Sequence, residues 1–191
     1  MGGGMIYIKW FLLALFDVML LFTVPFAAPI VAAFSQAQPH GQGTYSWGGW
    51  WGTYDNPPQG DEGFVDKRAW FVGVTTGWKG YLNRINWMIR NPMYGFARLT
   101  ALTYRADTVQ DLIGVDGISD KEGIPGWYFV RLREIKTLRV VGFEFYGVFP
   151  YSKTRDVRIR LGWKILTSKF KDKGFAPIVN TINPFDGYAN N

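Results

Sequence analysis

The sequence contains no cysteine, and its 191 residues include a single histidine, His40. Disulfide bonds, thiolate chemistry and cysteine-bound zinc are therefore excluded, and a metal site or catalytic triad built on histidine is nearly excluded. The motifs of common enzymes are also missing: there is no Gly-x-Ser-x-Gly, no phosphate loop, no dinucleotide fingerprint and no His-Glu-x-x-His. These absences predict a protein with no catalytic activity, no cofactor and no bound metal.

Low-complexity sequence and repeats are absent as well, and the composition argues for a folded chain. Aromatic residues make up 18% of the sequence, with nine tryptophans, and the formal net charge is +6. Disordered chains have few aromatic residues and low hydrophobicity, so a packed core is expected. The length fits one domain, or one domain with an appendage.

Charged residues are almost missing from the N-terminal part of the chain. The run from Trp10 to Phe34 is interrupted only by Asp17, Thr23, Pro25 and Pro29. At about 1.5 Å per residue, a helix over this run extends roughly 37 Å, enough to cross a hydrocarbon layer of about 30 Å. Each proline removes a backbone donor, so the helix is expected to kink or stop there.

Three interpretations of this run remain open: a kinked transmembrane helix, a helix followed by a re-entrant or interfacial segment, and a helix buried in a large assembly. A signal peptide would have a shorter apolar core and a cleavage site with small residues. Asp17 would be costly in lipid unless paired, so it is expected to contact another helix in an oligomer or to act as a proton or ion group. The side chains expected to leave water are Trp10, Phe11, Leu12, Leu13, Phe16, Leu20, Leu21, Phe22, Phe26 and Ile30.

The sequence suggests three segments: a membrane-inserting segment over 1–36, an irregular connector over 37–66 and a basic domain over 67–191. Glycine, proline and other turn formers predict the connector. Four of its aromatic residues, Trp47, Trp50, Trp51 and Tyr54, cluster just beyond the apolar run. Such rings suit the headgroup layer of a membrane, and they equally suit the core of the domain.

A helix is predicted in the third segment from Trp78 to Ile89, where apolar residues recur every three or four positions. Asn91 and Pro92 should end it. Its apolar stripe would either pack on a sheet or lie on a membrane surface.

The C-terminal half changes to the alternation typical of strands. Val157 to Ile165 places apolar residues at every second position, which predicts one buried and one solvated face. Val141 to Phe149 and Trp127 to Arg133 are predicted as two more strands. Short connections between sequential strands favour an antiparallel meander. The fold class is therefore α+β.

Basic residues lie on the expected polar side of these strands. Arg158, Arg160 and Lys164 share one strand, and Arg131 and Arg133 on another strand could join them. Such a face could bind phosphate oxygens of lipid headgroups or nucleic acid. The alternative is a solvated face neutralised by Glu134 and Glu144.

Several segments also occur in an order typical of a known family. They are Thr53–Pro57 with Gly60-Asp61, Trp87–Phe96, Gly126-Trp127-Tyr128, Arg160–Lys164 and Asn183-Pro184-Phe185. In these segments the chain resembles a family of small tailed-bacteriophage proteins that have an apolar N-terminus and no assigned activity. The resemblance implies a phage origin and no particular mechanism.

Together these observations predict a non-enzymatic phage protein in the host cell membrane or the virion, acting at the host envelope. Its expected partners are a membrane or a hydrophobic protein, with further copies of itself, and no small-molecule substrate is inferred. One alternative is a structural virion component, in the portal, tail or interior, with the apolar helix buried among other proteins. A second alternative is a nucleic-acid-binding module that uses the basic face.

Overall fold

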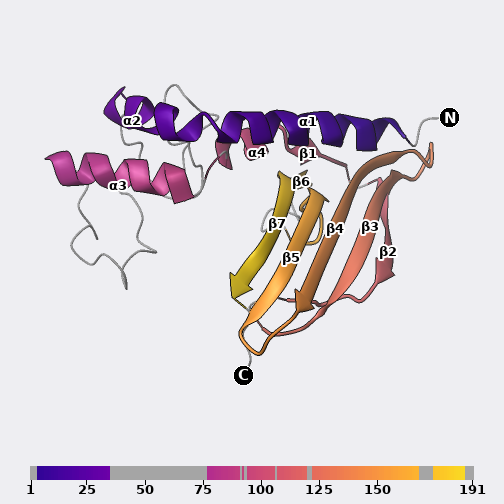
Figure 1. Ribbon diagram of the computed structural model, residues 1–191. Coiled ribbons are helices and arrows are strands. Elements are labelled where there is room, and N and C mark those ends of the chain that lie inside the picture. Colours follow the sequence, from indigo (N-terminus) through magenta and orange to yellow (C-terminus); the bar gives the residue numbers. More distant parts are fainter. Residues whose placement is uncertain are drawn as a thin grey trace. The chain divides into compact units, whose positions relative to one another are not determined.

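The computed structural model describes residues 4–34, 77–90, 92, 94–105, 107–119, 122–167 and 174–187. Within these residues, helices come first and an antiparallel sheet follows, which confirms the α+β class (Figure 1). The elements are α1 (Met5–Leu21), α2 (Val24–Phe34), α3 (Gly77–Arg90), α4 (Tyr94–Leu99), β1 (Leu102–Thr103), β2 (Thr108–Gly114), β3 (Gly126–Glu134), β4 (Val140–Pro150), β5 (Arg155–Trp163), β6 (Phe175–Ala176) and β7 (Ile178–Gly187).

The apolar N-terminal run forms two helices with a bend of 74° between α1 and α2. The break lies at Phe22 and Thr23. A helix that continued through it would bring the ring of Pro25 against the carbonyl of Leu21. In the first turn of α2 the missing N–H of Pro25 costs nothing, and the Thr23 carbonyl accepts the backbone N–H of Ala27 at 2.8 Å. The expected break is confirmed at the first of the two prolines, and it lies just before Pro25. The helix does not stop at the second, because Pro29 lies inside α2, which continues to Phe34.

The main sheet has five strands in the order β2-β3-β4-β5-β7, with every neighbouring pair antiparallel (Figure 1). Strands β3, β4 and β5 are the three strands expected from the alternation, so the meander is confirmed. Strands β2 and β7 extend it at the two edges, and the short strands β1 and β6 pair with each other.

The strand register defines two faces of the sheet. The Tyr128 face consists of Tyr128, Val130, Leu132, Glu144, Tyr146 and Val148, together with the strand-β5 residues opposite them. The Phe145 face consists of Trp127, Phe129, Phe143, Phe145, Phe149, Val157, Ile159, Leu161 and Trp163. The six named side chains of the Tyr128 face are all buried, at most 3% exposed. On the Phe145 face, Phe143 and Trp163 are buried, whereas Trp127 and Phe149 are exposed.

This burial corrects the expectation for strand β5. Trp163 is buried as expected, but Val157, Ile159 and Leu161 are only half-buried, and Asp156 is fully buried. Alternation separates two faces of a strand without showing which face the rest of the chain covers. Here Leu102 and Ile165, from outside the main sheet, lie against Gly142 on the Tyr128 face.

Helix α3 confirms the helix expected over Trp78 to Ile89 and ends at Arg90, just before Pro92. Its contacts are to helix α2: the Tyr81 hydroxyl donates to the carbonyl of Pro29 at 3.2 Å, and Arg84 donates to the carbonyl of Ala32 at 3.4 Å. Met88 on its apolar stripe is fully buried. Within its own unit, the helix therefore packs on another helix.

The chain forms two compact units, Met1–Ala14 with Thr100–Asn191, and Leu15–Leu99. The first half of α1 thus belongs to the unit that holds the sheet, and the second half belongs to the unit of α2 and α3. The expected boundaries at residues 36 and 66 lie outside the described residues, so the three expected segments stay a prediction.

Candidate functional site

The outer side of α1 is apolar and exposed. Its outer stripe consists of Met5, Ile8, Leu12, Leu15 and Met19, which are spaced by three or four residues and are between 50% and 71% exposed. Residues at this spacing lie on one side of a helix. A large apolar surface is therefore left uncovered along nearly the whole length of α1.

The inner side of α1 packs on the sheet of its own unit. The rings of Tyr7 and Trp10 lie 4.8 and 5.5 Å from the ring of Phe143, measured between centroids. The indole N–H of Trp10 donates to the carbonyl of Val179 at 3.2 Å, and the Asn180 amide donates to the carbonyl of Ala14 at 3.1 Å. Helix α1 thus has two apolar sides with different surroundings.

Helix α2 repeats this arrangement. Val24, Ala28, Val31 and Ala32 are buried. The α2 stripe consists of Phe26, Ile30 and Phe34 of the helix, together with Phe22 from the break before it; these residues are spaced by four and are between 53% and 77% exposed. Small residues therefore face the protein, and large aromatic and aliphatic residues face outward.

The ten side chains expected to leave water divide between these sides. Seven are exposed: Phe11, Leu12, Phe16, Leu21, Phe22, Phe26 and Ile30. Two are half-buried, Trp10 and Leu13, and Leu20 is buried. Asp17 is half-buried and follows Ala14 by three residues, so it lies on the inner side of α1 and away from the outer stripe. None of the described helices is by itself long and apolar enough to cross a bilayer, whereas α1 and α2 meet that requirement together as a bent pair.

The four aromatic residues expected at a membrane interface, Trp47, Trp50, Trp51 and Tyr54, lie outside the residues that the structure describes.

The structure does not bring the five expected basic residues to one face. Arg158 and Arg160 pair with residues of the Tyr128 face, whereas Arg131 pairs with Phe143 of the Phe145 face. Arg133 lies two residues from Arg131 on the same side, and Lys164 follows the end of β5. The sequence did not predict this separation of the basic residues. The register in which neighbouring strands pair decides which residues share a face, and the sequence of each strand alone does not give that register.

Most of these basic groups have partners within the protein. Arg133 donates a hydrogen bond of 2.7 Å to Asp111, and Arg131 lies 3.7 Å from the same carboxylate. The guanidinium of Arg160 lies 4.1 Å from the centre of the Tyr146 ring. Because of these contacts, the basic residues offer less unpaired positive charge to the phosphate groups of lipid headgroups or nucleic acid than the sequence indicated.

Glu144 forms a buried polar centre on the Tyr128 face that the sequence did not reveal. Its carboxylate is fully buried and accepts hydrogen bonds of 2.7 Å from the backbone N–H of Leu166 and from the hydroxyl of Thr167. Burial, and then the negative charge of Glu144, raise the pKa of Tyr128 far above its usual range. Glu144 fixes the turn after β5 to strand β4, which is a structural role. In the sequence, the only sign of this buried carboxylate is the position of Glu144 between two aromatic residues, Phe143 and Phe145.

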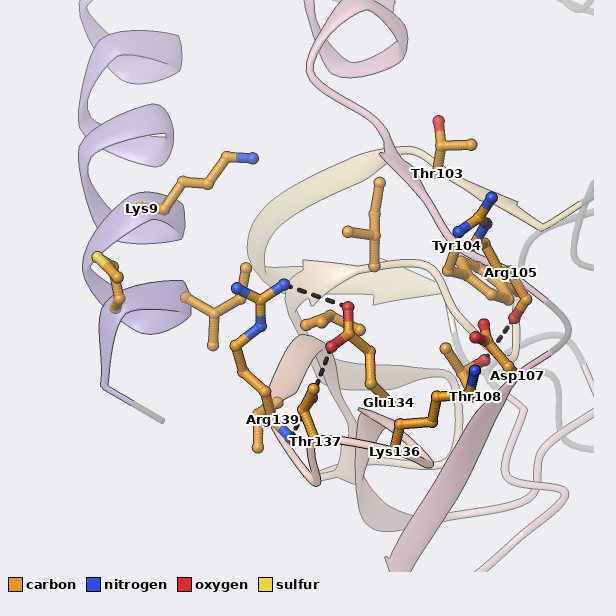
Figure 2. A pocket seen from close by; sticks show the side chains of 15 residues that line it. Lys9, Thr103, Tyr104, Arg105, Asp107, Thr108, Glu134, Lys136, Thr137 and Arg139 are labelled. Carbon is orange, nitrogen blue, oxygen red and sulfur yellow. Dashed lines mark hydrogen bonds and ion pairs between the residues drawn. The ribbon is translucent and has the colours of Figure 1, made fainter. Parts of the chain in front are cut away.

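A pocket of about 600 Å³ opens at the amino end of α1, entirely within the sheet unit. Its walls come from α1, the segment from β1 to β2, and the turn between β3 and β4 (Figure 2). Four basic side chains (Lys9, Arg105, Lys136 and Arg139) and two acidic ones (Asp107 and Glu134) line it. The pocket was not foreseen, because these residues come from segments that are distant in the sequence.

One ion pair inside the pocket is complete. Glu134 accepts a hydrogen bond from the Thr137 hydroxyl at 2.6 Å and pairs with Arg139 at 3.1 Å. The Thr137 hydroxyl, followed by Arg139, holds the pKa of Glu134 below its usual value. In the described part of the chain, the pocket included, no three His, Asp or Glu side chains gather as a metal site would require.

The fold and these surfaces define a small α+β protein that carries an apolar helix pair at its amino end. The chain belongs to the family of unknown function DUF7338, whose model matches residues 3–190. No curated protein and no solved structure matches the chain. The family match extends over both the helices and the sheet.

Proposed function

We propose that this chain is a non-enzymatic, membrane-associated protein of a tailed bacteriophage, held at the host envelope by the outer sides of α1 and α2. One observation carries the proposal. The outer stripe presents five large apolar side chains that are at least half exposed, and the α2 stripe presents four more. Apolar patches of this extent on a protein surface mark contact with a membrane or with another protein.

The packing of α1 favours a position in the plane of the membrane surface. Trp10 and Ala14 on the inner side contact the sheet, so lipid can reach only the outer side of this half of the helix. The sheet also carries charged side chains, such as Asp111 and Arg133, which are costly to move into hydrocarbon. A helix with one covered side and one exposed apolar side suits the boundary between headgroups and acyl chains.

The apolar surface of α1 is comparable to a lipid anchor. Burying a fully exposed large apolar side chain contributes about 1.5–3 kcal/mol, so a partly exposed one contributes about 1 kcal/mol. The five side chains of the outer stripe alone supply roughly 5 kcal/mol, about as much as the roughly 5.5 kcal/mol of a single myristoyl chain with an association constant of about 10⁴ M⁻¹. The four side chains of the α2 stripe are a second apolar surface of similar kind.

The phage origin and the site of action rest on the sequence segments that resemble proteins of tailed bacteriophages. An apolar surface on such a protein has two natural partners, the host membrane and other proteins of the particle. The near absence of charge from α1 and α2, where Lys9 and Asp17 are the only charged residues, supports the membrane.

Flotation with phosphatidylcholine vesicles tests this proposal on the purified full-length chain. The wild-type chain should float with the vesicles. The double variant Ile8→Glu/Leu12→Glu should bind roughly 100-fold more weakly, because each glutamate removes apolar contact and adds a charge, together about 3 kcal/mol.

The matched control is Val109→Glu/Ile182→Glu, which places the same charges on exposed apolar positions of strands β2 and β7. It should float like the wild type. A wild-type chain that stays with the soluble fraction, but is present in purified virions, would instead support the structural role in the particle.

A further inference from the structure

The basic pocket at the amino end of α1 has an excess of positive charge. Arg139 neutralises Glu134, which leaves Lys9, Arg105 and Lys136 against the single acid Asp107. Within the described part of the chain, none of these three basic side chains has an ion-pair partner. Figure 2 shows that they extend from three separate segments around the same pocket.

Exposed apolar side chains lie beside these basic groups. Met5 lines the pocket and is also the first residue of the outer stripe, at 71% exposed. In the turn between β3 and β4, Ile135 and Leu138 flank the pocket residues Lys136 and Thr137 and are 56% and 63% exposed. A turn that exposes two large apolar side chains next to a lysine suits insertion into the headgroup layer.

The backbone of this turn supports the same interpretation. Leu138 has a φ of 55°, and among the described residues it is the one non-glycine residue with a positive φ. The left-handed region is costly for leucine, and a residue held there often marks a site of function. The backbone N–H of Leu138 donates to the carbonyl of Glu134 at 2.9 Å, which keeps the turn closed and leaves the Leu138 side chain outside.

We propose that this pocket binds a phosphate-bearing anion, with Lys9, Arg105 and Lys136 as the groups that contact its oxygens. If the anion comes from a membrane, it is the headgroup of an anionic phospholipid. This version of the proposal rests on the proposed membrane function. In it, Met5, Ile135 and Leu138 enter the headgroup layer while the pocket takes the phosphate from the same surface. The other source is a soluble phosphate ester.

The test uses the full-length double variant Arg105→Gln/Lys136→Gln, which leaves α1 unchanged. Its matched control is Lys153→Gln/Arg155→Gln. This variant removes the same charge from two exposed positions, Lys153 in the turn after β4 and Arg155 at the start of β5, at the end of β4 away from the pocket. Each chain is titrated with vesicles of phosphatidylcholine, with the same vesicles containing phosphatidylglycerol, and with glycerol phosphate in solution. Circular dichroism checks that all three chains are folded.

Each lysine or arginine near an anionic surface contributes about fivefold to binding, so the pocket variant should bind phosphatidylglycerol vesicles about 25-fold more weakly than the control. Its binding to pure phosphatidylcholine should not change. If the pocket variant loses only the binding of glycerol phosphate, the source of the phosphate is soluble. If the two variants bind both phosphate probes equally, the pocket proposal is overturned.

The two proposals can fail separately. A wild-type chain that binds neither kind of vesicle contradicts the proposed membrane function, while glycerol phosphate still reports on the pocket. A wild-type chain that binds both kinds of vesicle equally and ignores glycerol phosphate contradicts only the pocket.

Discussion

The contact between α1 and the sheet predicts a large effect for Trp10→Ala. Trp10 is half-buried, lies with its ring edge against Phe143, and donates its indole N–H to the carbonyl of Val179. Phe143 in turn lies edge-on against Trp163, which is fully buried. Truncation of Trp10 therefore opens the junction between the helix and the core of the sheet.

The size of the effect follows from these contacts. Replacing a buried tryptophan by alanine costs about 3–5 kcal/mol, and because Trp10 is half-buried we expect about 3 kcal/mol. Roughly 1 kcal/mol of this comes from the hydrogen bond to Val179. With a urea dependence of about 2 kcal/mol per molar, the unfolding midpoint should fall by about 1.5 M.

The matched control is Phe11→Ala, which removes a large aromatic side chain from the next position of the same helix. Phe11 is 59% exposed, so its loss should change the free energy of unfolding by no more than about 0.5 kcal/mol. Urea unfolding followed by circular dichroism measures both. Equal midpoints for the two variants, or a larger loss for Phe11→Ala, would refute the assignment of inner and outer sides.

Two further predictions concern the sheet unit. Gly162 has a φ of 104°, and a Cβ there would overlap the carbonyl oxygen of Phe143, so Gly162→Ala should prevent a stable fold. The control is Gly117→Ala, because Gly117 has a φ of 81° but open space around it. This control should lower the free energy of unfolding, measured by thermal unfolding, by only about 1 kcal/mol. Because the folded-state pKa of Tyr128 is raised above its unfolded value of about 10, the tyrosine ionises first in the unfolded chain, and the free energy of unfolding should fall by about 1.4 kcal/mol per pH unit above pH 10. Tyr128→Phe should remove that part of the slope; an unchanged slope would show that burial of Tyr128 does not raise its pKa.

Local rules in the sequence were enough to predict the elements near strong signals. Pro25 set the break between α1 and α2 because its ring and its missing N–H act on the nearest turn of helix. The alternation around Phe145 and Leu161 set the strands of the meander for the same local reason. The edge strands β2 and β7 were not predicted, because Asp111 interrupts one pattern and Pro184 the other.

Features that depend on distant segments were not predictable. The split of Arg131 from Arg158 depends on the pairing register of three strands. The burial of Glu144 depends on the turn at Leu166 that covers it. The pocket requires Lys9 to meet Lys136, although more than a hundred residues separate them in the chain.

The absence of cysteine allows the central claim to be tested with single labels. A nitroxide is attached to Leu12→Cys on the outer stripe or to Ile182→Cys on strand β7, and both chains are mixed with phosphatidylcholine vesicles. Electron paramagnetic resonance then compares collisions with oxygen, which concentrates in lipid, and with a water-soluble relaxation agent. The label at position 12 should favour oxygen and the label at position 182 should favour the aqueous agent. A label at position 12 that stays equally accessible to the aqueous agent with and without vesicles would contradict the attachment of this protein to membranes through α1.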